Sequence, residues 1–216
     1  MTHSDLGRVD ERLSLTTKLP RMRLVVSDFM SLDGVVQAPG HEREDLDGDF
    51  RHGGWSMPYF DPDTMGPAFD ETIDAAGALL FGRRTYETMA GAWPERAGDP
   101  FADKMNAIKK YVASRTFRES DVTWHNATLL GGETAIGDVR RLKGEPGGDI
   151  VVMGSAALAR QLIAEGLVDE YLLMIEPILL GGGKRLFPDD TWARPLELVS
   201  VATAATGVLL CRYRPG

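Results

Sequence analysis

DIVVMGSAALARQLIAEG, at residues 149–166, has the pattern of a buried strand that runs directly into a helix. Its unbroken apolar run at 149–154 is typical of a strand covered on both faces of a sheet. Ser155 stands where a helix N-cap is expected, and Gly166 stands where a helix ends. Because a strand followed at once by a helix is the repeating unit of parallel sheets, this stretch predicts an α/β protein.

Elements on both sides of this unit continue the alternation of strands and helices. Further strands are predicted at residues 23–30, 78–81, 110–114, 122–125, 128–130, 170–180, 196–202 and 208–213. Helices are predicted at 69–76, 83–91, 101–109 and 133–142. The last two strands form a terminal hairpin, so we expect a mixed central sheet rather than a purely parallel one.

The N-terminal 21 residues are polar and mixed in charge. They lack the apolar central run of a signal peptide, so we expect a flexible N-terminal extension at 1–21 and a single domain at 22–216. No run approaches the roughly 18 apolar residues that a membrane-spanning helix needs, so no membrane partner is expected. The single cysteine, Cys211, cannot form an internal disulfide, which fits a reducing, cytoplasmic location.

The charge of the chain is concentrated in one stretch. With 24 Lys and Arg against 32 Asp and Glu, the net charge is −8. Residues 41–74 hold ten acidic and two basic side chains, and so account for the whole excess. A negative chain is a poor match for nucleic acid, so no such partner is expected. The acidic stretch is most simply a solvated surface, yet it includes a long loop at 41–67 of the kind that often binds ligands.

Motifs of several other enzyme classes fail at required positions. GGGKR at 181–185 is not a phosphate-binding P-loop, because Ile178 and Arg185 stand where glycine and a hydroxyl residue are needed. GWSMP at 54–58 lacks the final glycine of a nucleophile elbow. The sequence shows no cluster of Cys and His with metal-ligand spacing, so we expect no metal site.

FGRRTYE, at residues 81–87, lies at a predicted junction between a strand and a helix. Gly82 allows a close turn, and the first amides of the helix then offer a site for phosphate. Arg83 and Arg84 add charge-assisted hydrogen-bond donors. Because basic residues are unfavourable at a helix start, an anion is a better explanation for them than solvent-exposed arginines held by Glu87.

Two other strand ends offer similar groups. VASR at 112–115 closes a strand with Ser114 and Arg115, and Gly154 connects the strand at 149–154 to its helix. Taken alone, the second junction is equally well explained as an ordinary turn. Ligands of open α/β sheets bind at the carboxyl ends of strands. Three such ends together therefore predict an extended diphosphate ligand that carries an additional phosphate.

Four motifs resemble those of one known family. They are SLDG at 31–34, GRRTYE at 82–87, VASR at 112–115 and MGSAALARQLIAEGLVDEYLLMIEPILLGGGKRLF at 153–187. Their order over about residues 22–214 resembles the dihydrofolate reductase-like family. Within that family they are most similar to the C-terminal reductase domain of bifunctional riboflavin-biosynthesis deaminase-reductases and to its standalone relatives. The resemblance implies a three-layer α/β/α domain with a mixed central sheet, NADPH as hydride donor, and a homodimer.

The resemblance also implies contacts with the cofactor. Arg83 would pair with the 2′-phosphate, assisted by Ser114 and Arg115. Other groups would hold the diphosphate and border the nicotinamide. They are Gly82, Arg84 and Thr85 on one side, Gly154, Ser155 and Ala156 on the other, and Val36 beside the ring.

On the substrate side, the resemblance implies that Asp33 and Gly34 line the pocket. Asp33 is the first candidate to orient or protonate substrate, although an aspartate before a glycine is equally typical of a turn. Trp55 and Tyr59 are expected to form either an aromatic pocket wall or a satellite core cluster. Asp61 lies in the part of the chain where the carboxylate that protonates dihydrofolate would be expected, without a clear match to it.

These expectations define a function and its alternatives. We expect an NADPH-dependent reductase of a small heterocyclic or carbonyl substrate, similar to the 5-amino-6-(5-phosphoribosylamino)uracil reductase domain, with the cofactor supplying the hydride. One alternative is dihydrofolate reduction. Another is a nucleotide-binding protein without turnover, because a fold and a cofactor site do not establish chemistry. No match to the deaminase half or its zinc motif is seen, so a role in riboflavin synthesis does not follow.

Overall fold

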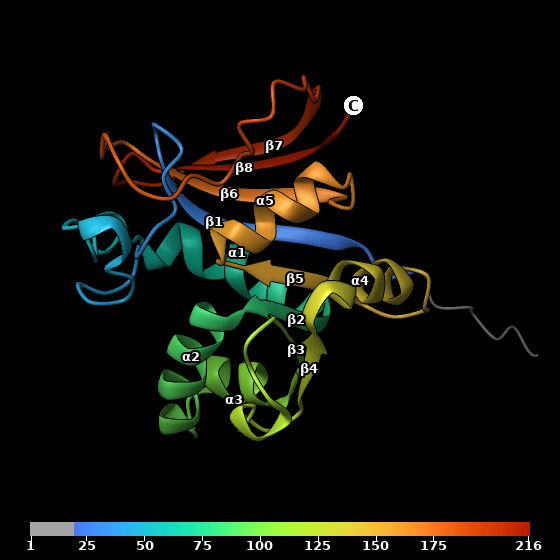
Figure 1. Ribbon diagram of the computed structural model, residues 1–216. Coiled ribbons are helices and arrows are strands. Elements are labelled where there is room, and N and C mark those ends of the chain that lie inside the picture. Colours follow the sequence, from blue (N-terminus) through green and yellow to red (C-terminus); the bar gives the residue numbers. More distant parts are fainter. Residues whose placement is uncertain (1–19) are drawn as a thin grey trace, which may run out of the picture.

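The computed structural model describes residues 20–216, and at its centre is an eight-stranded sheet (Figure 1). The strands are β1 (Leu24–Ser31), β2 (Ala76–Gly82), β3 (Lys109–Ser114), β4 (Ala127–Gly131), β5 (Asp149–Met153), β6 (Glu170–Glu176), β7 (Leu196–Thr203) and β8 (Leu209–Pro215). Their order is β4-β3-β2-β5-β1-β6-β8-β7. Strands β1 to β6 pair in parallel, whereas β8 is antiparallel to both β6 and β7. The expected mixed sheet with a terminal hairpin is therefore confirmed.

Helices cover both faces of this sheet. The described α-helices are α1 (Pro62–Ala75), α2 (Arg83–Ala92), α3 (Pro100–Ala107), α4 (Ala135–Lys143) and α5 (Ala156–Ala164). Short 3-10 turns lie at Asp47–Asp49, Met57–Tyr59, Pro94–Arg96, Glu119–Asp121 and Gly132–Thr134. Leu142 of α4 and Leu162 of α5 join the core on one face, while Tyr86 of α2 and Met105 of α3 join the core on the other. The result is the expected three-layer α/β/α arrangement (Figure 1).

Strand β2 shows why short apolar runs specify the middle of this sheet. From Ala78 to Phe81 its side chains are at most 1% exposed. Leu80 belongs to the core beneath α4 and α5, and its neighbour Phe81 belongs to the opposite core. Successive side chains thus point to opposite faces, and each large one contributes about 1.5–3 kcal/mol through burial.

Two strand predictions were wrong. Residues 122–125 form no strand, because Trp124 is instead buried in the core and its backbone N–H donates to the Tyr86 hydroxyl at 2.8 Å. Strand β6 ends at Glu176 rather than at residue 180, because Pro177 follows and has no N–H to donate to a neighbouring strand.

Helix α1 begins seven residues before the predicted start of 69, so the loop that precedes it is shorter than expected. The Asp61 side chain accepts a hydrogen bond from the Asp63 N–H, which is the bond of an N-cap. Pro62 occupies the first helical position, where its missing N–H costs nothing. The local signals for a helix start were therefore present in the sequence.

The chain enters the fold just before β1. Residues 1–19, which make up nearly all of the expected extension, lie outside the described residues. Arg21 forms an isolated antiparallel bridge with Pro146, and the Pro20 carbonyl accepts a hydrogen bond from the Gly147 N–H at 2.9 Å. In the part of the chain that the structure describes, no helix has the length and apolarity needed to cross a membrane.

The sheet splits between β1 and β5. Strand β1 pairs with β5 only from Leu24 to Ser27, whereas its pairing with β6 continues to Ser31. Strand β5 ends at Met153, opposite Ser27. An opening therefore forms at the carboxyl ends of parallel strands, which is where ligands of α/β sheets bind.

Candidate active site

A cavity of about 1060 Å³ lies at this split. The carboxyl ends of β2, β3 and β5 line it, together with the middle of β1 at residues 27–29, the first residues of α2 and α5 and a loop at 36–47. Its volume suits an extended small-molecule ligand. All ten residues expected to bind the cofactor are on its wall: Val36, Gly82, Arg83, Arg84, Thr85, Ser114, Arg115, Gly154, Ser155 and Ala156. The structure thus brings together three strand ends that are far apart in the sequence.

Helices α2 and α5 both begin at this cavity. Among the described residues, neither helix start receives a side-chain capping hydrogen bond. Their first backbone amides, combined with the helix dipoles, can therefore hold a diphosphate. The backbone also packs tightly here, since a Cβ on Gly82 would lie 2.4 Å from the Ser155 Oγ.

Ser155 is not the N-cap that the sequence predicts. Its backbone is left-handed, with φ of 65°, and it follows Gly154 with φ of 71°. Its hydroxyl oxygen instead accepts a hydrogen bond from the Gly82 N–H at 2.8 Å and lies 2.7 Å from the Thr85 Oγ1. The side chain therefore ties the start of α2 to the start of α5.

One end of the cavity is cationic. Arg83 and Arg115 are both exposed, and neither forms an ion pair with a described residue. Arg83 donates to the Thr116 hydroxyl at 3.2 Å. Ser114 shapes the turn after β3, because its hydroxyl oxygen accepts hydrogen bonds from the N–H groups of Thr116 and Phe117 at 3.2 and 3.0 Å. Two available guanidinium groups beside hydroxyls are well suited to a phosphate monoester.

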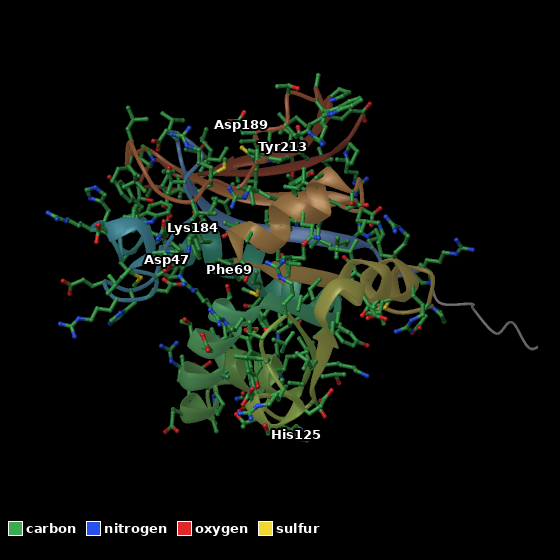
Figure 2. The ribbon with its side chains drawn as sticks, viewed as in Figure 1. Asp47, Phe69, His125, Lys184, Asp189 and Tyr213 are labelled. Carbon is green, nitrogen blue, oxygen red and sulfur yellow. The ribbon has the colours of Figure 1, made fainter. Side chains whose placement is uncertain are left out.

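Arg84, in contrast, is bound to the acidic stretch. It pairs with Asp45 at 2.6 Å and also with Asp47. Lys184 pairs with the same carboxylates, at 2.5 Å from Asp45 and 2.9 Å from Asp47, and Figure 2 shows Lys184 and Asp47 close together. Hydrogen bonds from Arg84 and Lys184 lower the pKa of Asp47 to about 2. These pairs fasten the loop as one wall of the cavity, which leaves the backbone amide of Arg84 as its contribution to a diphosphate site.

Asp33 and Gly34 lie in a turn away from the cavity wall. The Asp33 carboxylate accepts hydrogen bonds from the Ser31 hydroxyl at 2.7 Å and from the N–H groups of Leu180 and Gly181 at 3.1 and 2.9 Å. The bond from Ser31 is the largest cause that lowers the pKa of Asp33 to about 2. Asp33 therefore holds no proton near neutral pH, and the turn aspartate considered as the alternative is what the structure shows.

Trp55, Tyr59 and Asp61 are also absent from the described cavity wall. Trp55 is buried in a small core cluster and donates its Nε1–H to the Gln37 carbonyl at 2.8 Å. Tyr59 packs against a separate core cluster beneath α1. The Asp61 carboxylate caps α1, and a hydrogen bond from the Ala205 N–H is the largest cause that lowers its pKa. Of the two interpretations of the aromatic residues, the structure supports the satellite core.

The sequence reasoning missed a group of residues that line the cavity beside the split. They are Asp28, Phe29, Gln37, Glu44, Phe69 and Met174. Asp28 is 4% exposed, and desolvation raises its pKa well above the usual range, with a further contribution from Glu44. Burial also raises the pKa of Glu44. The signal in the sequence is Asp28, an acidic residue inside the apolar run at 23–30. That run predicts a strand, and the prediction assigns no role to the acidic residue.

The chain is similar over almost its full length to known sequences. A family model described as the RibD C-terminal domain matches residues 23–210. An uncharacterized protein of Bacillus subtilis (strain 168), YyaP, is 31% identical over 204 residues, which span 92% of this chain and 98% of that protein.

Two solved structures share the fold. Dihydrofolate reductase from Enterococcus faecalis, complexed with NADP(H), has a TM-score of 0.59 at 15% identity and covers 92% of this chain and 99% of its own. A diaminohydroxyphosphoribosylaminopyrimidine deaminase/5-amino-6-(5-phosphoribosylamino)uracil reductase from Thermotoga maritima has a TM-score of 0.59 at 14% identity, and the match covers 91% of this chain and 57% of that one. The chain therefore belongs to the RibD C-terminal domain family, a reductase-like family with the α/β fold of dihydrofolate reductase.

Proposed function

We propose that this protein is an NADPH-dependent reductase that transfers a hydride to the carbon of a C=N or C=O bond in a small heterocyclic or carbonyl substrate. The observation that carries the proposal is the convergence on one cavity of two helix starts and two arginines, Arg83 and Arg115, for which the described residues supply neither a side-chain cap nor an ion pair. That cavity ends in the split of the sheet, beside apolar side chains that include Val36 and Met174. Membership of a reductase-like family supports the same class of chemistry.

The described residues fit NADPH along the length of the cavity. Arg83 and Arg115 would hold the 2′-phosphate, and the first amides of α2 and α5 would hold the diphosphate. When bound, NADPH supplies the hydride. The chain itself orients both ligands, and its buried wall at the split excludes water from the reacting atoms.

The acidic wall favours an uncharged substrate. On this wall Arg84 and Lys184 are paired with Asp45 and Asp47, and Glu44 adds a carboxyl group, so the wall offers a second phosphorylated ligand neither of these cations as a free partner. Phosphoribosylated pyrimidines, which are named for the Thermotoga maritima protein, are therefore a weaker proposal for this chain than neutral heterocycles and carbonyl compounds. Dihydrofolate reduction also receives less support, because Asp61 is used as a helix cap.

Fluorescence titration with NADPH and NADH tests the cofactor assignment. We expect NADPH to bind at least about tenfold more tightly, which corresponds to about 1.4 kcal/mol from the 2′-phosphate. Equal affinities would contradict the assignment of Arg83 and Arg115. NADPH oxidation would then be measured with pterins, quinazolines, flavin precursors and aldehydes. Tight binding without oxidation across this panel would favour a nucleotide-binding protein without turnover.

We also propose that the protein is a homodimer that pairs through β7. This strand is at the edge of the sheet, and Leu198 and Val201 are 55% and 53% exposed. Exposed apolar edge strands are uncommon in monomers, because they promote association. Sedimentation velocity should show a dimer for the wild type and a monomer for Leu198→Lys, and a wild-type monomer would contradict the proposal. A cytoplasmic location stays a prediction.

A further inference from the structure

Asp28 is the first residue of β1 beyond its pairing with β5. The last paired residues are Ser27 and Met153, whereas on the other side Asp28 remains paired with Leu173 of β6. Asp28 also lines the cavity. It therefore lies where the sheet first opens, at the place where a flat ring can enter between the two strands.

The Asp28 carboxyl group is buried and incompletely bonded. Its Oδ2 atom has no hydrogen-bond partner among the described residues. Burying an ionised carboxylate in this way costs several kcal/mol, whereas a protonated carboxyl group is neutral and has a hydrogen to donate. A buried carboxyl group of this kind on a cavity wall is a candidate for a functional role, because an apolar side chain would pack there without the cost of burying a polar group.

The charged groups around the cavity give an ionised Asp28 no stabilising partner. Besides Asp28, the charged residues on the wall are Glu44, Asp45, Asp47, Arg83, Arg84, Arg115, Arg160 and Lys184. Arg84 and Lys184 are paired with Asp45 and Asp47, and no described cation forms an ion pair with Asp28. Glu44 is the one charged group that shifts the pKa of Asp28, and it raises it.

Glu44 lines the same cavity as Asp28, from the loop at 36–47. It is half-buried, and its carboxylate accepts hydrogen bonds from the N–H groups of Gly40 and His41 at 2.8 and 3.2 Å. Its own pKa is raised by burial, so it can exchange protons closer to neutrality than an ordinary glutamate. The other candidate acids lack this arrangement, because Asp33 and Asp61 are ionised and used in a turn and a cap.

We infer that Asp28 is the proton donor of the reductase reaction proposed above. The hydride, with its two electrons, adds to the carbon of the C=N or C=O bond. The O–H bond of Asp28 breaks, and its proton forms a new bond to the substrate nitrogen or oxygen. Asp28 is left as a carboxylate and regains a proton from solvent through the cavity that it lines. This inference rests on the proposed reductase function.

Carbon-13 NMR of aspartate-labelled protein tests the first requirement without any substrate. The Asp28 signal is the carboxyl resonance that Asp28→Asn removes. We expect it to titrate well above the range of ordinary aspartates, and titration within that range would overturn the inference. Asp28→Asn should fold at least as stably as the wild type at pH 8, because a neutral amide avoids the burial cost. Asp63→Asn is the matched control, since Asp63 is exposed on α1.

Calorimetry of cofactor binding in two buffers of different ionisation enthalpy tests the position of Asp28. The oxidised cofactor carries a positive ring, so its binding should release a proton from Asp28, whereas binding of NADPH should not. Asp28→Asn should abolish that release and weaken NADP⁺ about tenfold, while NADPH affinity stays within about twofold. Equal proton release by wild type and variant would overturn the inference about Asp28 and leave the reductase proposal standing. Failure of the wild type to bind either cofactor would overturn the reductase proposal, and this inference with it.

Discussion

The two ends of the cavity differ in how the sequence encodes them. At the cofactor end, each contributing site is a junction between a strand and the segment directly after it, so residues that act together are neighbours in the chain. All ten residues expected there line the cavity. At the substrate end, none of the five expected residues does. The residues of a site built from strand ends can therefore be predicted from short stretches of sequence. The residues of a site formed by a loop cannot, because distant residues decide where that loop lies.

Asp33 illustrates the difference. Its carboxylate is occupied by the N–H groups of Leu180 and Gly181, which lie 147 and 148 residues further along the chain. Nothing near residue 33 in the sequence reveals those partners. Arg83, in contrast, lies directly after β2 and reaches the turn after β3, because β2 and β3 are adjacent parallel strands.

Of the variants described below, Gly82→Ala should disrupt the cofactor end of the cavity most severely. The added Cβ would lie 2.4 Å from the Oγ and 2.8 Å from the Cβ of Ser155, so the starts of α2 and α5 must move apart. We expect a loss of about 1–3 kcal/mol in the free energy of unfolding. We also expect NADPH affinity to fall by about 100-fold or more, equivalent to about 2.7 kcal/mol. Urea denaturation and fluorescence titration measure these effects.

The double variant Gly82→Ala with Ser155→Gly is the control. It removes the clashing side chain and places a glycine at the left-handed position, so most of the lost stability should return. A double variant no more stable than Gly82→Ala would show that the contact with Ser155 is not the cause.

Arg83→Ala should separate the two cofactors. Loss of a charge-assisted contact with the 2′-phosphate should cost about 1.5–3 kcal/mol, or about 10- to 100-fold in NADPH affinity, and leave NADH almost unchanged. Arg140→Ala provides a matched control, because Arg140 is exposed and pairs with Glu165 away from the described cavity wall. An equal loss for NADPH and NADH would mean that Arg83 supports the fold rather than the phosphate.

Glu176→Gln tests how the pH dependence of stability depends on Glu176, which contacts the loop at the substrate end through Ser56. Glu176 is fully buried and accepts a hydrogen bond from the Ser56 hydroxyl at 2.5 Å, and burial raises its pKa to about 7. The folded state therefore holds this proton more tightly than the unfolded chain. Its contribution to stability is complete below the unfolded pKa and is lost as pH rises through the folded pKa.

The glutamine variant should consequently be about 2–3 kcal/mol more stable relative to the wild type at pH 8 than at pH 4.5. Urea denaturation at both values measures the difference, and Glu197→Gln on exposed β7 should show none. Identical pH dependence in wild type and Glu176→Gln would contradict the assignment.

Asp33→Asn should have the smallest effect of these variants. It tests whether Asp33 acts only in a turn, outside the substrate end of the cavity. Weaker acceptance of the turn hydrogen bonds should lower the melting temperature by a few degrees. The pH profile of the reaction should stay unchanged, because the carboxylate is ionised throughout the working range. Loss of activity with an unchanged melting temperature would restore Asp33 as a catalytic residue.

Much of the fold could be predicted because the apolar runs of the sheet are short, uninterrupted and separated by helices. One error occurs where a single distant contact decides the structure, at Trp124, whose backbone N–H is bonded to the Tyr86 hydroxyl. The errors at the start of α1 and the end of β6 have local signals instead, in Pro62 and Pro177. Asp28 is a different case. Its presence within β1 is visible in the sequence, but its meaning depends on β5 ending opposite Ser27, which only the register of the sheet reveals.

Ion pairs join the acidic side chains of the stretch at 41–74 to other elements, in addition to the buried contacts of residues such as Trp55 and Met65. The cationic partners come from separate elements: Arg84 and Lys184 bind Asp45 and Asp47, Lys104 binds Asp70 and Asp74, and Arg212 binds Glu71. Such pairs are screened by added salt, since the Debye length falls from about 10 Å at 0.1 M to about 3 Å at 1 M. The apolar cores on either side of the sheet do not depend on this screening. Ionic strength therefore acts on one wall of the cavity and leaves the sheet behind it intact.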